Sequence, residues 1–82
     1  MIDRYAAYIE AGAEEIRKMA EALERAHGVE EKDRLRRMRE LEAELTLPDD
    51  IYEDVGLLDE LAGIREDVVA KARAIYEEVM AA

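Results

Sequence analysis

The chain has 82 residues, a formal net charge of −10 and no cysteine. The missing cysteine excludes disulfide bonds, thiol chemistry and thiolate metal sites, and the negative charge opposes binding to nucleic-acid phosphates and to anionic membranes. The charge is uneven, because residues 1–41 hold nine Lys or Arg against ten Asp or Glu, whereas residues 42–82 hold three against twelve. We therefore expect no nucleic-acid partner and no membrane partner.

The N-terminus carries charge at once, at Asp3 and Arg4, and leads into an amphipathic pattern. A signal peptide is not expected from such a start. No apolar run approaches the roughly 18 residues that a membrane-spanning helix needs. The localisation is left unknown by these features.

The first predicted helix covers residues 2–27. Its apolar residues recur every three or four positions, so that Ile9, Ile16 and Leu23 fall within a narrow arc of a helix. Gly28 follows His27 directly, and a glycine just after a helix can take the left-handed conformation that ends it.

The second predicted helix covers residues 30–46 and has a thin apolar seam made by Leu35, Met38, Leu41 and Leu45. Pro48 disfavours a helical residue before it and donates no backbone hydrogen bond, so the helix is expected to break there. Thr46 and Asp49 have the spacing of a capping box. This spacing predicts that the helix restarts over residues 49–55.

The third predicted helix covers residues 58–81, where apolar residues again recur in steps of three and four. The apolar pattern changes phase at Gly56, and Val55-Gly56-Leu57 resembles the glycine-terminated helix end at His27-Gly28-Val29. We therefore place a boundary at Gly56.

These boundaries divide the chain into three rods of nearly equal length, each about 39 Å at roughly 1.5 Å per residue. Short loops make neighbouring helices antiparallel. The sequence thus predicts an all-α fold over residues 1–82, a single up-down-up three-helix bundle with the middle helix broken near Pro48.

Six residues are candidates for an interface. We expect Tyr8 and Tyr52 to be partly exposed, Arg65 to fall inside the apolar arc of the third helix, and a small-residue stripe to lie on its opposite face at Gly63, Ala70 and Ala74. Each feature also has a structural explanation. A tyrosine can lie at the edge of the core with its hydroxyl in water. An arginine can lay its aliphatic stem along the core while its guanidinium reaches water or a carboxylate. A glycine inside a helix can be tolerated, because it lowers helix stability by only about 1 kcal/mol relative to alanine.

The basic run Arg34, Arg36, Arg37 and Arg39 is expected to be neutralised on the helix surface. Glutamate or aspartate stands four positions away in Glu30–Arg34, Asp33–Arg37 and Arg36–Glu40, the spacing of helical ion pairs. We therefore predict no phosphate site at this run.

Metal binding and catalysis have little support in the residues present. Glu24 and His27 form one Glu-x-x-His motif, but a carboxylate-bridged metal site needs two such motifs and two further glutamates, so a dimer would be required. The acids around Gly56 do not fit the register of a calcium loop. Serine is absent and Thr46 is the single threonine. We predict a non-enzyme with no catalytic residue, no cofactor and no metal.

The whole chain resembles de novo designed helical-bundle miniproteins in style and composition. The resemblance rests on helices rich in Ala, Glu, Leu and Arg, on glycine helix ends and on the missing Cys and Trp. It carries no specific motif. It implies a non-catalytic bundle that acts as a protein-binding module or scaffold through a helical face. The alternative is a natural small acidic helical protein that self-associates, so the expected partner is another protein or a second copy.

Overall fold

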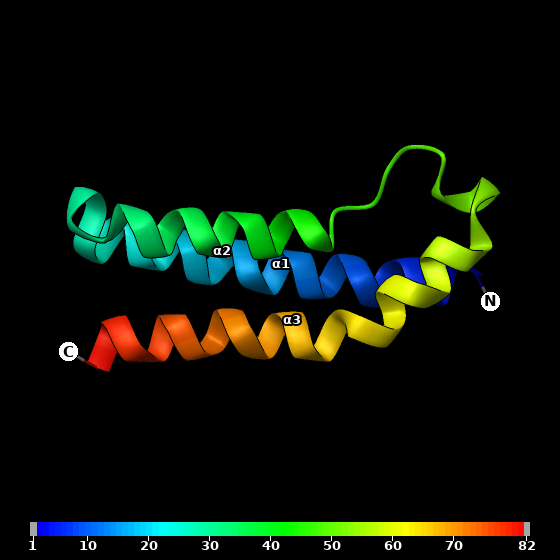
Figure 1. The fold of residues 1–82 in the computed structure, drawn as a ribbon. Coiled ribbons are helices and arrows are strands. Elements are labelled where there is room, and N and C mark those ends of the chain that lie inside the picture. The colour runs from blue at the N-terminus through cyan, green and yellow to red at the C-terminus, as the bar shows by residue number, and fades with distance from the viewer. Residues whose placement is uncertain (1, 82) are drawn as a thin grey trace.

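A computed structural model describes residues 2–81, and all of its regular structure is helical over that range. Three α-helices form the bundle: α1 (Ile2–His27), α2 (Lys32–Glu44) and α3 (Val55–Ala81). Two 3-10 turns, Gly28–Glu31 and Ile51–Glu53, stand in the two connections. Helices α1 and α3 run in the same direction, and α2 runs in the opposite direction (Figure 1). The all-α class and the packing of the helices on one another confirm the coarse prediction.

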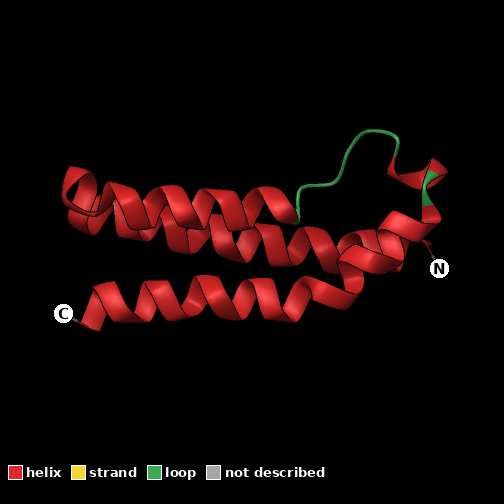
Figure 2. Ribbon diagram, viewed as in Figure 1, coloured by secondary structure: helices red, strands yellow, loops and turns green. Residues whose placement is uncertain are grey.

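The end of α1 is where the sequence places it. Gly28 has a φ of 55°, a left-handed backbone conformation that glycine adopts without a steric penalty. The helix therefore stops at His27, and the 3-10 turn that follows brings the chain round into α2 (Figure 2).

Helix α2 ends earlier than predicted, at Glu44, and does not resume as an α-helix before Val55. The expected capping box at Thr46 is wrong, because the Thr46 hydroxyl donates backwards to the carbonyl of Glu42 at 3.0 Å. The Thr46 hydroxyl thus bonds back to α2, and no α-helix begins at Asp49 for it to cap. Beyond Pro48 the chain forms only the short 3-10 turn Ile51–Glu53.

The boundary predicted at Gly56 is also wrong, because α3 begins at Val55 and runs through the glycine. Its N-cap is Asp54, whose Oδ1 accepts the backbone N–H of Leu57 at 3.0 Å and whose carbonyl accepts the N–H of Leu58 at 3.2 Å. Aspartate is among the best N-cap residues since it satisfies a free N–H of the first turn. Gly56 therefore lies inside a capped first turn.

The core is built from aliphatic side chains of all three helices. Ile9, Ile16 and Leu23 of α1 are fully buried, as the apolar spacing predicts. They pack with side chains that include Met38, Leu41, Leu45, Leu58, Val69, Ala72 and Val79. No polar or charged residue is classed as buried among the side chains that the structure describes.

The helices differ in length, which contradicts the expectation of three equal rods. Helix α2 has 13 residues, whereas α1 has 26 and α3 has 27. Leu45, just after α2, lies over the middle of α1, because its Cδ1 stands 3.2 Å from the position that a Cβ would take at Gly12. The N-terminal halves of α1 and α3 thus extend past α2, and only the 45–54 segment accompanies them (Figure 2).

Candidate interaction surface

Arg65 lies between α1 and α3 and crosses directly over Gly12. An ideal Cβ on Gly12 would stand 2.7 Å from Nε and 3.0 Å from Cγ of Arg65. The side chain is 19% exposed, and its Nε is buried without a hydrogen-bond partner among the described residues. The close approach of the arginine stem to the α1 backbone is therefore possible because residue 12 has no side chain.

The guanidinium of Arg65 is held by two side chains of α1. Its Cζ lies 4.5 Å from the ring centroid of Tyr8, the arrangement of a cation–π contact. Its Nη2 lies 3.9 Å from a carboxylate oxygen of Glu15, which also pairs with Arg73. The Tyr8 hydroxyl donates to Glu66 at 3.3 Å.

This cluster joins two helices rather than presenting a free cation. The core-edge explanation of Arg65 fits, since its stem is covered and its head meets a carboxylate of another helix. Tyr8 and Arg65 are the two interface candidates that the structure brings together. Gly12 and Glu15 were not singled out from the sequence, although Tyr8, Gly12 and Glu15 have helical spacing that aligns them on one face.

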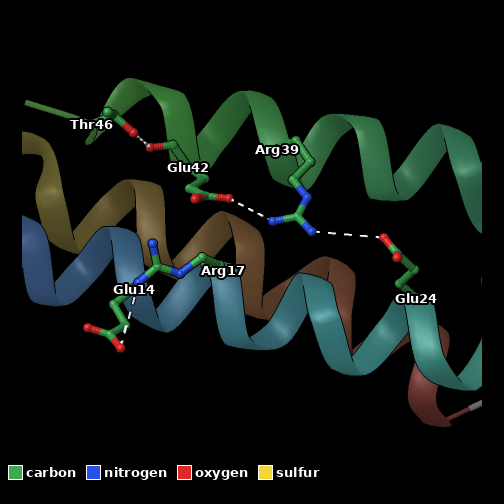
Figure 3. A network of polar contacts seen from close by, with 6 residues as sticks. All are labelled: Glu14, Arg17, Glu24, Arg39, Glu42 and Thr46. Atoms are coloured by element: carbon green, nitrogen blue, oxygen red, sulfur yellow. Dashed lines mark hydrogen bonds and ion pairs between the residues drawn. The ribbon is translucent and has the colours of Figure 1, made fainter.

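The basic run on α2 is neutralised, but through different partners from those expected. Arg36 pairs with Asp33 at 3.1 Å and Arg37 with Glu40 at 3.8 Å, three positions away rather than four. Arg39 pairs with Glu42 at 3.0 Å and reaches Glu24 of α1 at 3.9 Å (Figure 3). Arg34 reaches across to Glu78 of α3 at 2.9 Å. Each arginine has a carboxylate partner, so the run offers no converging anion site.

Within the described residues of the single chain, Glu24 and His27 are not joined by further side chains that could complete a metal site. Glu24 is turned toward Arg39 of α2 (Figure 3). Among residues 2–81 no group of three or more His, Asp or Glu side chains is placed to hold a metal ion. His27 is the last residue of α1.

The small-residue stripe at Gly63, Ala70 and Ala74 faces outward on α3. Nothing lies within 4 Å of the position that a Cβ would take at Gly63, so no other part of the described chain approaches there. The first half of α3 is bent (Figure 1), and glycine is one of the residues at which helices commonly bend.

Exposed apolar side chains gather at one end of the bundle. Tyr5 near the start of α1 is 47% exposed, Tyr52 in the 3-10 turn is 54% exposed, and Val55 at the start of α3 is 54% exposed. All three elements lie at the end where the N-terminus is found (Figure 1). Of these, Tyr52 is predicted from the sequence, whereas Tyr5 falls inside the apolar arc and is exposed because α2 does not reach it.

The same end carries nearly all of the negative charge. We name residues 4–14 and 45–67 the acidic end; they hold ten Asp or Glu against two Lys or Arg, a formal charge of −8. Residues 15–44 and 68–81, which form the opposite end, hold eleven against ten, a charge of −1. The charge asymmetry of the sequence is thus an asymmetry along the long axis of the molecule.

No family model, curated protein or solved structure matches the chain. No helix within residues 2–81 combines the length and the apolar character that crossing a membrane requires.

Proposed function

We propose that the chain is a non-catalytic helical bundle that binds a protein partner, or serves as a scaffold, through a helical face at its acidic end. This is the role of the de novo designed miniproteins that its sequence resembles. The carrying observation is the exposure of Tyr5, Tyr52 and Val55 on three neighbouring elements at one end of the molecule. Aromatic side chains of this kind are enriched in the buried centres of protein interfaces.

Three of the six candidate residues have a task in this proposal. Tyr52 is free to contact a partner, since more than half of its surface is exposed. Tyr8 and Arg65 hold α1 against α3 through their cation–π contact and act on an interface indirectly.

The alternative is a natural acidic helical protein that self-associates through the stripe at Gly63, Ala70 and Ala74 or through the edge at Tyr8. It is favoured by the open space at Gly63, because small residues on a helix let a second backbone approach closely. The net charge of −10 opposes it, since two like-charged copies repel.

Site-specific photocrosslinking separates the two proposals. A benzophenone amino acid is placed at Tyr52 and, as a control, at Ala43, an exposed position on α2. We expect Tyr52 to crosslink one partner that Ala43 does not, and Tyr52→Ala to weaken binding of that partner once it is identified. Equal crosslinking from both positions would overturn the proposal. A dimer by light scattering at micromolar concentration would support self-association instead.

A dimeric metal protein built on Glu24 and His27 is the third hypothesis carried from the sequence. Elemental analysis of protein purified without a metal-binding tag tests it. Metal-free protein that is fully folded by circular dichroism removes this hypothesis.

A further inference from the structure

We propose that residues 47–53, which we name the strap, open and close as a unit while the three helices stay packed, and that Tyr52 moves with them. The opening concerns the chain alone, and its consequence for the interaction surface rests on the proposed function. The inference follows from how the two ends of the strap are bonded and from how little holds its middle.

Both ends of the strap adjoin a residue that is bonded to a helix. The Thr46 hydroxyl donates to the carbonyl of Glu42 at 3.0 Å, so the chain is bonded to α2 up to this residue. At the other end, Asp54 caps α3 by accepting the amide of Leu57 at 3.0 Å. Neither helix therefore has to unwind when the residues between Thr46 and Asp54 move.

Few contacts hold the strap between these ends, where it arches away from the helices (Figure 2). Among residues 2–81, no ion pair or side-chain hydrogen bond includes a strap residue. The backbone N–H groups of Ile51 and Glu53 donate to carbonyls of the strap itself. Five of its seven side chains are exposed, whereas Ile51 is 3% exposed and Leu47 is partly buried. Ile51 is thus the main attachment of the strap to the core.

The strap covers apolar side chains that α2 does not reach. Ala6, Ile9 and Leu58 are 0–3% exposed, although the chain leaves α2 at the level of Gly12. Ile51 belongs to the same buried cluster. Opening removes Ile51 from this cluster and leaves the buried side chains of the three helices packed on one another. An opening that breaks so few apolar contacts requires less free energy than unfolding of the whole bundle.

The strap carries one of the three exposed apolar side chains of the acidic end. Tyr52 lies in the strap, whereas Tyr5 and Val55 lie on α1 and α3. The three side chains share one end of the molecule when the strap is closed, and Tyr52 leaves the other two when it opens. A partner that contacts all three therefore binds with an affinity reduced by the fraction of chains in which the strap is closed.

Native-state hydrogen exchange of the full chain, labelled with ¹⁵N, tests the opening. The amides of Ile51, Glu53 and Asp54 report on the strap, because their bonds to strap carbonyls do not persist in a single detached turn. The amides of Leu23 and Leu41 report on the bundle. We expect the strap amides to be protected to similar degrees, at least about tenfold less than the bundle amides. Low concentrations of urea should lower strap protection less than bundle protection, because the opening exposes less surface.

Two matched variants, Ile51→Val and Ile16→Val, separate opening of the strap from unfolding of the bundle. Both isoleucines are buried, and each variant removes one methylene group. Ile51→Val should lower the protection of the strap amides about two- to tenfold. Ile16→Val should lower the protection of the bundle amides by a similar factor and leave the strap amides unchanged, since Ile16 stays packed when the strap opens. Both variants should keep the circular dichroism spectrum of the parent.

Three results would overturn the inference: strap amides as protected as the bundle amides, strap amides without protection, or an equal loss of strap protection in both variants. Its failure is distinguishable from failure of the proposed function. If the strap opens as expected while Tyr52 crosslinks no specific partner, the opening stands and the proposed function falls. If Tyr52 crosslinks a specific partner while strap and bundle amides are equally protected, the proposed function stands and the strap inference falls.

Discussion

Replacing Gly12 with alanine probes the contact between α1 and Arg65 most directly. The new methyl group would stand 2.7 Å from Arg65 Nε, 3.0 Å from its Cγ and 3.2 Å from Leu45 Cδ1. Leu45 is fully buried; Cγ belongs to the aliphatic stem of Arg65, and Nε belongs to its guanidinium, which lies against Tyr8 and is buried at Nε. The methyl group therefore forces the stem off its course across α1 or pushes into the core.

Two opposing effects set the magnitude. Alanine is favoured over glycine inside a helix by about 1 kcal/mol, whereas overpacking a close contact costs about 1–3 kcal/mol. We expect Gly12→Ala to lower the free energy of unfolding by about 1 kcal/mol, or by roughly 4–8 °C in Tm for a domain of this size. Gly63→Ala meets no steric conflict, because nothing lies within 4 Å of the position that its Cβ would take. It should raise the free energy of unfolding by about 0.5–1 kcal/mol.

Urea denaturation of the parent, both single variants and a double-mutant cycle provides the assay. In an Arg65→Ala background the steric conflict is largely removed, so Gly12→Ala should become neutral or stabilising. The difference between the two backgrounds measures the coupling between the residues. If Gly12→Ala stabilises the parent as much as Gly63→Ala does, the close approach of Arg65 to α1 is refuted.

Three further perturbations have defined outcomes. Tyr8→Ala should lower the free energy of unfolding by about 1 kcal/mol through loss of its cation–π contact, whereas Tyr52→Ala should change it by less than about 0.5 kcal/mol, both by urea denaturation. Asp54→Ala should lower the free energy of unfolding by about 1 kcal/mol, because it removes the N-cap of α3, whereas Asp54→Asn should keep most of that stability. An equal loss of stability with asparagine would contradict the capping role. Raising the salt concentration from ~10 mM to ~150 mM should raise Tm, because the acidic end is screened, and an unchanged or lower Tm would argue against repulsion there.

The fold class and the first helix could be predicted from local pattern. Apolar spacing placed Ile9, Ile16 and Leu23 in the core, and Gly28 marked a helix end because its left-handed backbone is a local property of the chain. Gly56 shows the limit of that reasoning. Gly56 is also a glycine, but it lies in the first turn of α3, which Asp54 caps. The change of phase in the apolar pattern at Gly56 therefore accompanies the start of a helix and not the end of one.

The candidate site was predicted in part. The helical pattern places Arg65 inside an apolar arc and predicts that its guanidinium reaches water or a carboxylate. It does not identify Glu15 as that carboxylate. Gly12 could not be assigned to it, because the crossing depends on the relative positions of α1 and α3, which no local pattern specifies. The shortness of α2 was missed for a similar reason: equal rods were assumed, whereas the 45–54 segment takes the place of half a helix.

The parallel course of α1 and α3 leaves the two chain termini at opposite ends of a body 41 Å long (Figure 1). A fluorophore, affinity tag or fused domain attached after α3 therefore stands far from Tyr5, Tyr52 and Val55. The same attachment before α1 would crowd these side chains. Immobilisation through the C-terminus is accordingly the orientation in which a biosensor surface would keep this end accessible.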